Sequence, residues 1–226
     1  MNPKTAFVST LLFDWDGTLV DSAQLGLNAF EQSFRALGVA FDHEIYQRVY
    51  SPNWYSVYEA MGLPKDKWET ADELWIRHYG EQTAQLVEGA QETIVGLRRK
   101  RFRLGVVSSG SDCRVAREIK ELGFDNLFEV VVCNEQMEKK KPHPEGLETA
   151  MRTLGSLPEE SCYVGDSPED IEMGKRARMM TVGVRSAYPT SWKLESCSPD
   201  IFIGSLVELL DHFDDSKSNP INQGQL

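Results

Sequence analysis

Short apolar runs that stop abruptly at polar clusters constrain the fold of this chain more than any other feature of its sequence. Near-continuous apolar runs of this length are typical of strands that are buried on both faces of a parallel sheet. Four such runs stand out: residues 11–13 stop at Asp14, residues 102–107 at Ser108, residues 128–133 at Asn134 and residues 162–164 at Gly165-Asp166.

Helical patterns alternate with these runs, over about residues 112–122, 144–154 and 168–178. Two further strands are expected at residues 181–184 and 200–203. This alternation predicts an α/β fold in which helices cover both faces of a Rossmann-like parallel sheet. Ligands of such sheets bind at the carboxyl ends of the strands. We therefore expect the polar clusters, which all lie at those ends, to meet in one crevice.

The pattern changes between residues 20 and 88, where helical segments follow one another without a strand. They are expected near residues 23–37, 43–50, 54–61 and 66–85. This segment is interpreted as an all-helical cap domain inserted over the crevice. Residues 1–19 and 89–213 then form the catalytic α/β core, and the polar, unpatterned residues 214–226 are expected to be a disordered tail.

The composition excludes several classes of partner. The formal net charge is −11, so long-range electrostatics repels nucleic acid and anionic lipid. Four widely separated cysteines form no Cys-x-x-Cys pair, which favours reduced thiols over a zinc site. Residues 1–10 do not resemble a secretory signal, and no window approaches ~18 consecutive apolar residues. We expect a soluble, cytoplasmic protein without nucleic-acid or membrane partners, whose oligomeric state the sequence does not indicate.

Four aspartates carry the strongest chemical signal. Asp14 and Asp16 follow the first run, and Asp166 and Asp170 follow the run at residues 162–164. Four carboxylates in one pocket would repel one another and raise each other's proton affinity, which a divalent cation such as Mg²⁺ would relieve. Each motif alone is as well explained by ordinary turn chemistry, so the interpretation depends on their occurring together.

Four motifs in this order resemble those of the haloacid dehalogenase superfamily of phosphatases, in the phosphoglycolate-phosphatase-like branch with a helical cap. The resemblance covers about residues 11–210. The matching motifs are Phe13-Asp14-Trp15-Asp16-Gly17-Thr18, Ser108 at the end of a core strand, Lys141-Pro142 before a helix, and Asp166 followed by Asp170.

The resemblance implies specific roles for the aspartates. Asp14 would be the nucleophile that forms an aspartyl-phosphate. Asp16 would protonate the leaving oxygen, later activate water, and offer its backbone carbonyl to the metal. Asp166 would be a metal ligand alongside Asp14, while Asp170 would either join them or hold their geometry.

Three further residues would bind the phosphoryl oxygens. Ser108 would contribute its hydroxyl and Ser109 a backbone amide, with Ser109 as the competing assignment for the hydroxyl. Lys141 would place its charge beside both the nucleophile and the phosphate. Alone, Ser108 is an ordinary turn serine and Lys141 a surface lysine. Trp54, Tyr55 and Tyr58 in the cap are candidates for a substrate pocket, although aromatics at helical spacing more often serve packing.

The expected function is Mg²⁺-dependent hydrolysis of a small phosphorylated metabolite. A phosphomutase of a sugar phosphate is an alternative, because it uses the same aspartyl-phosphate. A catalytically silent binding module is a second alternative, although no motif residue is missing. Asp16 argues against a dehalogenase, because a halide leaves without a proton. The substrate stays open, since these motifs contact only the phosphoryl group.

Overall fold

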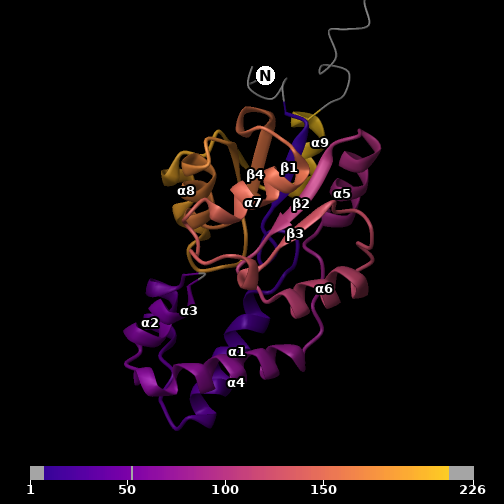
Figure 1. Ribbon diagram of the computed structural model, residues 1–226. Coiled ribbons are helices and arrows are strands. Elements are labelled where there is room, and N and C mark those ends of the chain that lie inside the picture. Colours follow the sequence, from indigo (N-terminus) through magenta and orange to yellow (C-terminus); the bar gives the residue numbers. More distant parts are fainter. Residues whose placement is uncertain (1–7, 52, 214–226) are drawn as a thin grey trace, which may run out of the picture.

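The computed structural model describes residues 8–51 and 53–213, and the expected tail at residues 214–226 lies outside them (Figure 1). The described core contains a six-stranded, all-parallel sheet in the order β3-β2-β1-β4-β5-β6. The strands are β1 Thr10–Phe13, β2 Arg103–Val107, β3 Val130–Val132, β4 Ser161–Gly165, β5 Met180–Val184 and β6 Ile201–Ile203. The predicted α/β parallel sheet is confirmed.

Helices cover both faces of the sheet because alternate strand residues point in opposite directions. Leu11 and Phe13 of β1 join one buried cluster, together with side chains of α5 (Ala90–Arg99) and α6 (Asp112–Glu121). Leu12 joins a second cluster with side chains of α7 (Glu145–Leu154) and α8 (Pro168–Arg176). A short helix, α9 (Leu209–His212), packs against α5 on the first face.

The strand register brings three motif-bearing loops to one edge of the sheet. Phe13 pairs with Val106 of β2 on one side and Val164 of β4 on the other. Asp14 therefore leaves the sheet level with the ends of both neighbouring strands. The loops after β1, β2 and β4 lie side by side, as the sequence predicts.

Four α-helices, referred to below as the insert, lie between β1 and α5 in the described residues: α1 Ala23–Ala36, α2 His43–Val49, α3 Trp54–Ala60 and α4 Trp68–Gly80. They enclose an aromatic-rich cluster of their own that includes Phe30, Phe34 and Trp75. The insert lies beyond the carboxyl edge of the sheet (Figure 1). Its exact bounds as a separate domain stay a prediction.

The fourth expected helix is shorter than the sequence pattern suggested. It was expected to reach residue 85, but α4 ends at Gly80. Glu81 and Gln82 form a turn, and after it the exit of the insert pairs with its entry: Asp21 N–H donates to the Gln85 carbonyl and Val87 N–H to the Leu19 carbonyl. We call these two linkers, residues 19–22 and 84–87, the paired linkers.

Two further observations complete the description. All four cysteines are unpaired thiols. Within residues 8–51 and 53–213, no helix is both long and apolar enough to cross a membrane.

Candidate active site

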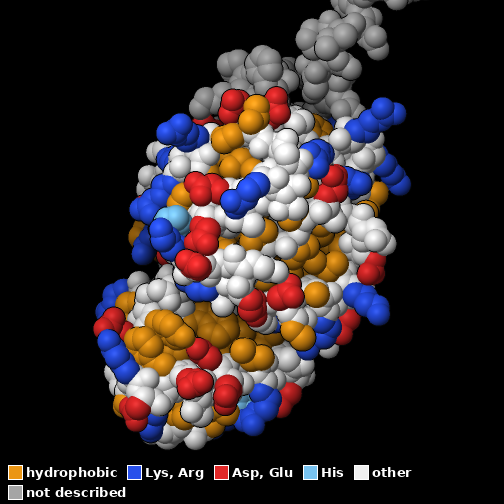
Figure 2. Space-filling model, viewed as in Figure 1, with side chains coloured by type: hydrophobic (Ala, Val, Ile, Leu, Met, Phe, Trp, Pro, Cys, Tyr) orange, Lys and Arg blue, Asp and Glu red, His pale blue; other side chains and the backbone are white. Residues whose placement is uncertain are grey.

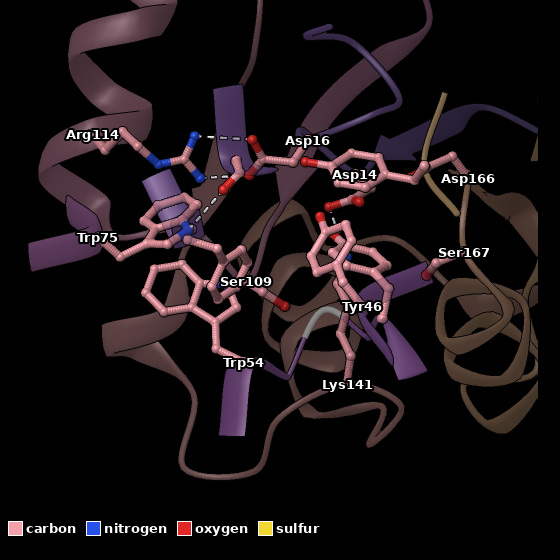
Figure 3. Close-up of a pocket in the computed structure, with 15 residues that line it drawn as sticks. Asp14, Asp16, Tyr46, Trp54, Trp75, Ser109, Arg114, Lys141, Asp166 and Ser167 are labelled. Carbon is pink, nitrogen blue, oxygen red and sulfur yellow. Dashed lines mark hydrogen bonds and ion pairs between the residues drawn. The ribbon is translucent and has the colours of Figure 1, made fainter. Parts of the chain in front are cut away.

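Three carboxylates converge at the edge of the sheet where the motif loops meet. Asp14 follows β1, Asp166 follows β4, and Asp170 lies in the first turn of α8. One oxygen from each lies within 4.8 Å of the others, and all three side chains are buried. Figure 3 shows Asp14 and Asp166 facing the same cavity.

The loop after β1 reaches Asp166 because Gly17 has no side chain. Gly17 adopts φ +80°, and a Cβ there would lie 2.3 Å from an oxygen of Asp166. This close approach lets the Thr18 hydroxyl donate to Asp166 at 3.2 Å, while Ser186 donates to its other oxygen at 2.6 Å. Ser186 lies after β5, so three loops fix the orientation of Asp166.

Lys141 places its ammonium between two of the carboxylates. Its Nζ donates to Asp14 and to Asp170 at 2.7 Å each, and only 2% of its side chain is exposed. Burial acts to lower the pKa of Lys141, but the charges of Asp14 and Asp170 outweigh it and hold the pKa well above its usual value. Lys141 is therefore a buried, charged residue, unlike its exposed neighbours Lys139 and Lys140.

Both oxygens of Asp170 are already occupied by protein donors. One accepts from Lys141 and from the Tyr163 hydroxyl, and the other accepts from the backbone and side chain of Ser167. Ser167 in turn caps α8 by accepting from the Asp170 amide, in a reciprocal capping box. This arrangement fixes Asp170 as the support of Lys141.

The charge balance of the cluster suits a divalent cation. Burial, with repulsion from Asp170, raises the pKa of Asp14 to about 7 despite the opposing charge of Lys141. Burial and the same repulsion raise the pKa of Asp166 well above its usual value. Asp14 and Asp166 are therefore buried carboxylates whose negative charge the nearby cation offsets only in part. Their oxygens are the hard ligands that Mg²⁺ prefers.

Asp16 does not join this cluster. Its carboxylate forms a two-pronged ion pair with Arg114 at 3.0 and 2.5 Å (Figure 3). Burial acts to raise the pKa of Asp16, but Arg114 outweighs it and holds the pKa below its usual value. Arg114 also donates to the buried Glu118, which accepts from the Trp15 indole at 2.7 Å.

Sequence reasoning missed Arg114 and Glu118. Both lie on α6, with only 8% and 1% of their side chains exposed, and they connect α6 to the loop after β1 through Asp16 and Trp15. The available signal was a pair of opposite charges four residues apart on a helix face directed at the crevice. That signal is common on solvent-exposed helices, so it does not single out these residues.

The two candidate serines are placed differently. Ser108 is fully buried, and its hydroxyl accepts from the Gly110 amide at 2.9 Å. Ser109 lines the cavity that holds Asp14, whereas Ser108 is absent from its lining. The structure thus brings Ser109 to the cavity surface directly and Ser108 to the wall behind it.

The insert closes the site from the other side. Tyr50 of the insert stacks on Tyr188 of the core with ring centroids 4.8 Å apart, and the Ser51 hydroxyl donates to Glu169 at 3.1 Å. The cavity at Asp14 measures about 50 Å³, enough for a few water-sized groups. Trp54 lines this cavity, whereas Tyr58 is buried inside the insert.

Comparisons with known proteins agree with this geometry. The family described as haloacid dehalogenase-like hydrolase matches residues 11–184. Relatives named pyrophosphatase PpaX include those of Listeria welshimeri, 30% identical over 91% of this chain and 96% of the relative, and of Halalkalibacterium halodurans, 30% identical over 90% and 96%.

Solved structures show the same fold. CbbY from Rhodobacter sphaeroides in complex with phosphate superposes with a TM-score of 0.75 at 24% identity, covering 89% of this chain and 96% of that one. A predicted phosphoglycolate phosphatase from Haemophilus somnus gives 0.80 at 21% identity, covering 92% and 98%.

Proposed function

Because the chain belongs to the family of haloacid dehalogenase-like hydrolases, we propose that it is a magnesium-dependent phosphatase that hydrolyses a small phosphorylated metabolite through a phosphorylated Asp14. The observation that carries the proposal is the cluster of three buried carboxylates with the Lys141 ammonium between two of them. An ordinary structural role would not require three carboxylates to meet away from water.

Asp14 is the group best placed to attack phosphorus. It lies at the floor of the cavity, and Lys141 fixes one of its oxygens. The attack forms a bond from this carboxylate to phosphorus and breaks the bond to the leaving oxygen. Asp16 gives that oxygen a proton and later takes one from the water that cleaves the aspartyl-phosphate. To do so, Asp16 has to free one oxygen from Arg114 and take up a proton on it, while its other oxygen stays held by the guanidinium.

The remaining residues hold charge and geometry. Asp14 and Asp166 would hold Mg²⁺, together with the backbone carbonyl of Asp16. The bound cation would offset negative charge on the phosphoryl group. Lys141 and the loop at Ser108 and Ser109 would donate to the phosphoryl oxygens. Asp170 would keep Lys141 in place instead of ligating the metal, because its two oxygens already accept four hydrogen bonds.

Support for hydrolysis over transfer comes from the relatives. Those at 30% identity are named pyrophosphatases, which hand phosphoryl groups to water. The structural neighbours lie below 25% identity and support the fold alone, so no structural observation favours the phosphomutase. A cytoplasmic location stays a prediction.

The test is a phosphate-release assay with a panel of phosphoesters, run with Mg²⁺ and with excess chelator. We expect phosphate release to require Mg²⁺. After rapid quenching in acid, mass spectrometry should detect a phosphoryl group on the peptide that contains Asp14. Full activity in chelator would contradict the metal site. Label on a different residue would contradict the nucleophile. Transfer to a sugar phosphate without release would favour the mutase.

A further inference from the structure

A second cavity lies beside the phosphoryl site, between α3 and α4 of the insert and the loops after β2 and β3. It measures about 310 Å³ and shares walls with the cavity at Asp14, including Trp54, Trp75 and Ser109. The leaving group of an ester bound at Asp14 therefore has a direct path into it. Resting on the proposed function, we propose that this cavity binds a planar heteroaromatic ring in the leaving group, as in a nucleoside 5′-monophosphate.

The wall on the insert side exposes hydrophobic surface that folding did not bury. Tyr55 is 46% exposed and Ile76 is 48% exposed, and both line this cavity. They are two of only four large hydrophobic side chains that are exposed within the described residues. Figure 2 shows hydrophobic side chains gathered on the insert beside the waist of the molecule. Clustered exposed apolar side chains at a cleft mark a binding surface.

The aromatic wall is fixed before any ligand arrives. Tyr55 stacks on Trp68 at 4.8 Å with an interplanar angle of 25°, and its hydroxyl donates to Asp72 at 3.0 Å. Trp54 contacts Trp75 at 4.1 Å, and Trp75 stacks on Tyr79 at 4.9 Å. A wall held in this way loses little conformational entropy when a flat ring packs against it.

The charges around the cavity argue against a small anionic leaving group. Each of the three cations in its wall already donates to protein acceptors: Lys141 to two aspartates, Arg114 to Asp16 and Glu118, and Lys140 to two backbone carbonyls. Asp72 and Glu135 also line the cavity. A phosphate or carboxylate bound there would lie beside carboxylates, and the nearby cations already donate to protein acceptors. An uncharged ring would meet aromatic faces.

The size and polarity of the cavity restrict the class of leaving group further. A volume of about 310 Å³ is at the small end of the range of about 300–1,000 Å³ for small-molecule sites. It suits one ring system with its sugar and is small for a dinucleotide. Asn53 and Asn134 also line the cavity, and their amides offer both donors and acceptors to the edge of a heterocycle.

The test compares two phosphate esters whose leaving oxygen occupies the same position on the sugar. Uridine 5′-monophosphate and ribose 5-phosphate both lose their phosphoryl group from the 5-oxygen of a ribose, so the ratio of their kcat/KM values reports the contribution of the ring. We expect the nucleotide to be favoured by roughly tenfold or more, as aromatic stacking of a base provides. Pyridoxine 5′-phosphate distinguishes a pyridine ring from a nucleoside. Pyrophosphate serves as the ring-free anionic substrate.

Variants assign the preference to the wall. Tyr55→Leu should lower kcat/KM for uridine 5′-monophosphate, and with it the ratio, about tenfold. Tyr55→Phe, which keeps the ring, should retain it. Trp192→Leu is the matched control, because Trp192 is 75% exposed and lines neither cavity.

Failure of this inference can be distinguished from failure of the proposed function. Equal or better cleavage of ribose 5-phosphate or pyrophosphate would overturn the inference and leave the proposed phosphatase intact. Absence of turnover and of label on Asp14 with every substrate would overturn both.

Discussion

The two sides of the active site are built on opposite principles. On the core side, charged groups meet at the ends of parallel strands, and Asp14, Lys141 and Asp166 are each fixed by hydrogen bonds at 2.6 to 3.2 Å. On the insert side, aromatic side chains stack on one another and leave apolar faces exposed. Under the proposed function, the core side would hold the phosphoryl group and the insert side would contact the leaving group.

The two sides also differ in how much change they can accommodate. The strand-end geometry depends on a few residues and a fixed register, so substitutions there disturb the site directly. Packing of aromatic side chains within the insert can vary while the total volume and pattern are preserved.

The largest expected effect is on the core side. Asp14→Asn removes the attacking carboxylate, so kcat should fall by at least about 10³-fold. Far-ultraviolet circular dichroism should match the parent protein, because asparagine has the same shape and can still contact Lys141. Retained activity in this variant would mean that another group attacks phosphorus.

A pair of substitutions tests the division of labour between two aspartates. Asp166→Asn removes a proposed metal ligand and should raise the Mg²⁺ concentration needed for half-maximal activity at least tenfold. Asp170→Asn disturbs Lys141 and should lower kcat about 10- to 100-fold with a smaller change in Mg²⁺ requirement. Equal shifts in Mg²⁺ requirement would place both residues on the metal.

Arg114→Met tests whether the ion pair positions Asp16. Since two hydrogen bonds to Asp16 are lost, kcat/KM for an alkyl phosphate should fall about tenfold, because its leaving oxygen needs a proton. For p-nitrophenyl phosphate, whose leaving group needs none, the loss should be below about threefold. Arg114→Lys is the control that keeps the charge. An equal loss for both substrates would indicate a structural role only.

The smallest effect concerns stability and its dependence on pH. The pKa of Asp14 is raised to about 7 by burial, so the folded state binds more protons than the unfolded state between about pH 4 and pH 7. Stability without metal should therefore fall as pH rises through this window, and the loss should persist above it.

Asp14→Asn in chelator should accordingly raise Tm at pH 8 by a few degrees and change it little at pH 4. With saturating Mg²⁺ at pH 8, the parent protein should instead have the higher Tm of the two. A lower Tm of the variant in chelator at pH 8 would show that the contact with Lys141 outweighs the desolvation of the carboxylate.

Sequence and structure agree best where a local pattern is sufficient. Asp14, Ser108 and Asp166 could be placed at one edge because each ends an apolar run, and parallel topology aligns those ends. The bounds of the three predicted core helices agree within about two residues, as for α8, expected at residues 168–178 and observed at Pro168–Arg176, whereas no bounds were predicted for α5 and α9. β3 is shorter than expected, since only Val130–Val132 pair with β2.

The remainder depends on contacts that span the chain. The partner of Asp16 lies 98 residues away on α6, and Ser186 reaches Asp166 from the loop after β5. No local pattern marks either residue. The pairing between Val20 and Leu86, which ends α4 early, is a tertiary effect that overrides helix propensity. The aromatic residues of the insert fitted both packing and ligand binding: Tyr58 is buried inside the insert, whereas Trp54 and Tyr55 line cavities.

The paired linkers carry one more consequence. Entry and exit of the insert are joined by backbone hydrogen bonds, through Asp21 to Gln85 and Val87 to Leu19. Because the two linkers are tied to each other, any hinge motion of the insert would have to move both of them together. They also leave the core at one place. A different helical insert could therefore be joined to the core at the paired linkers without changing the residues at the strand ends.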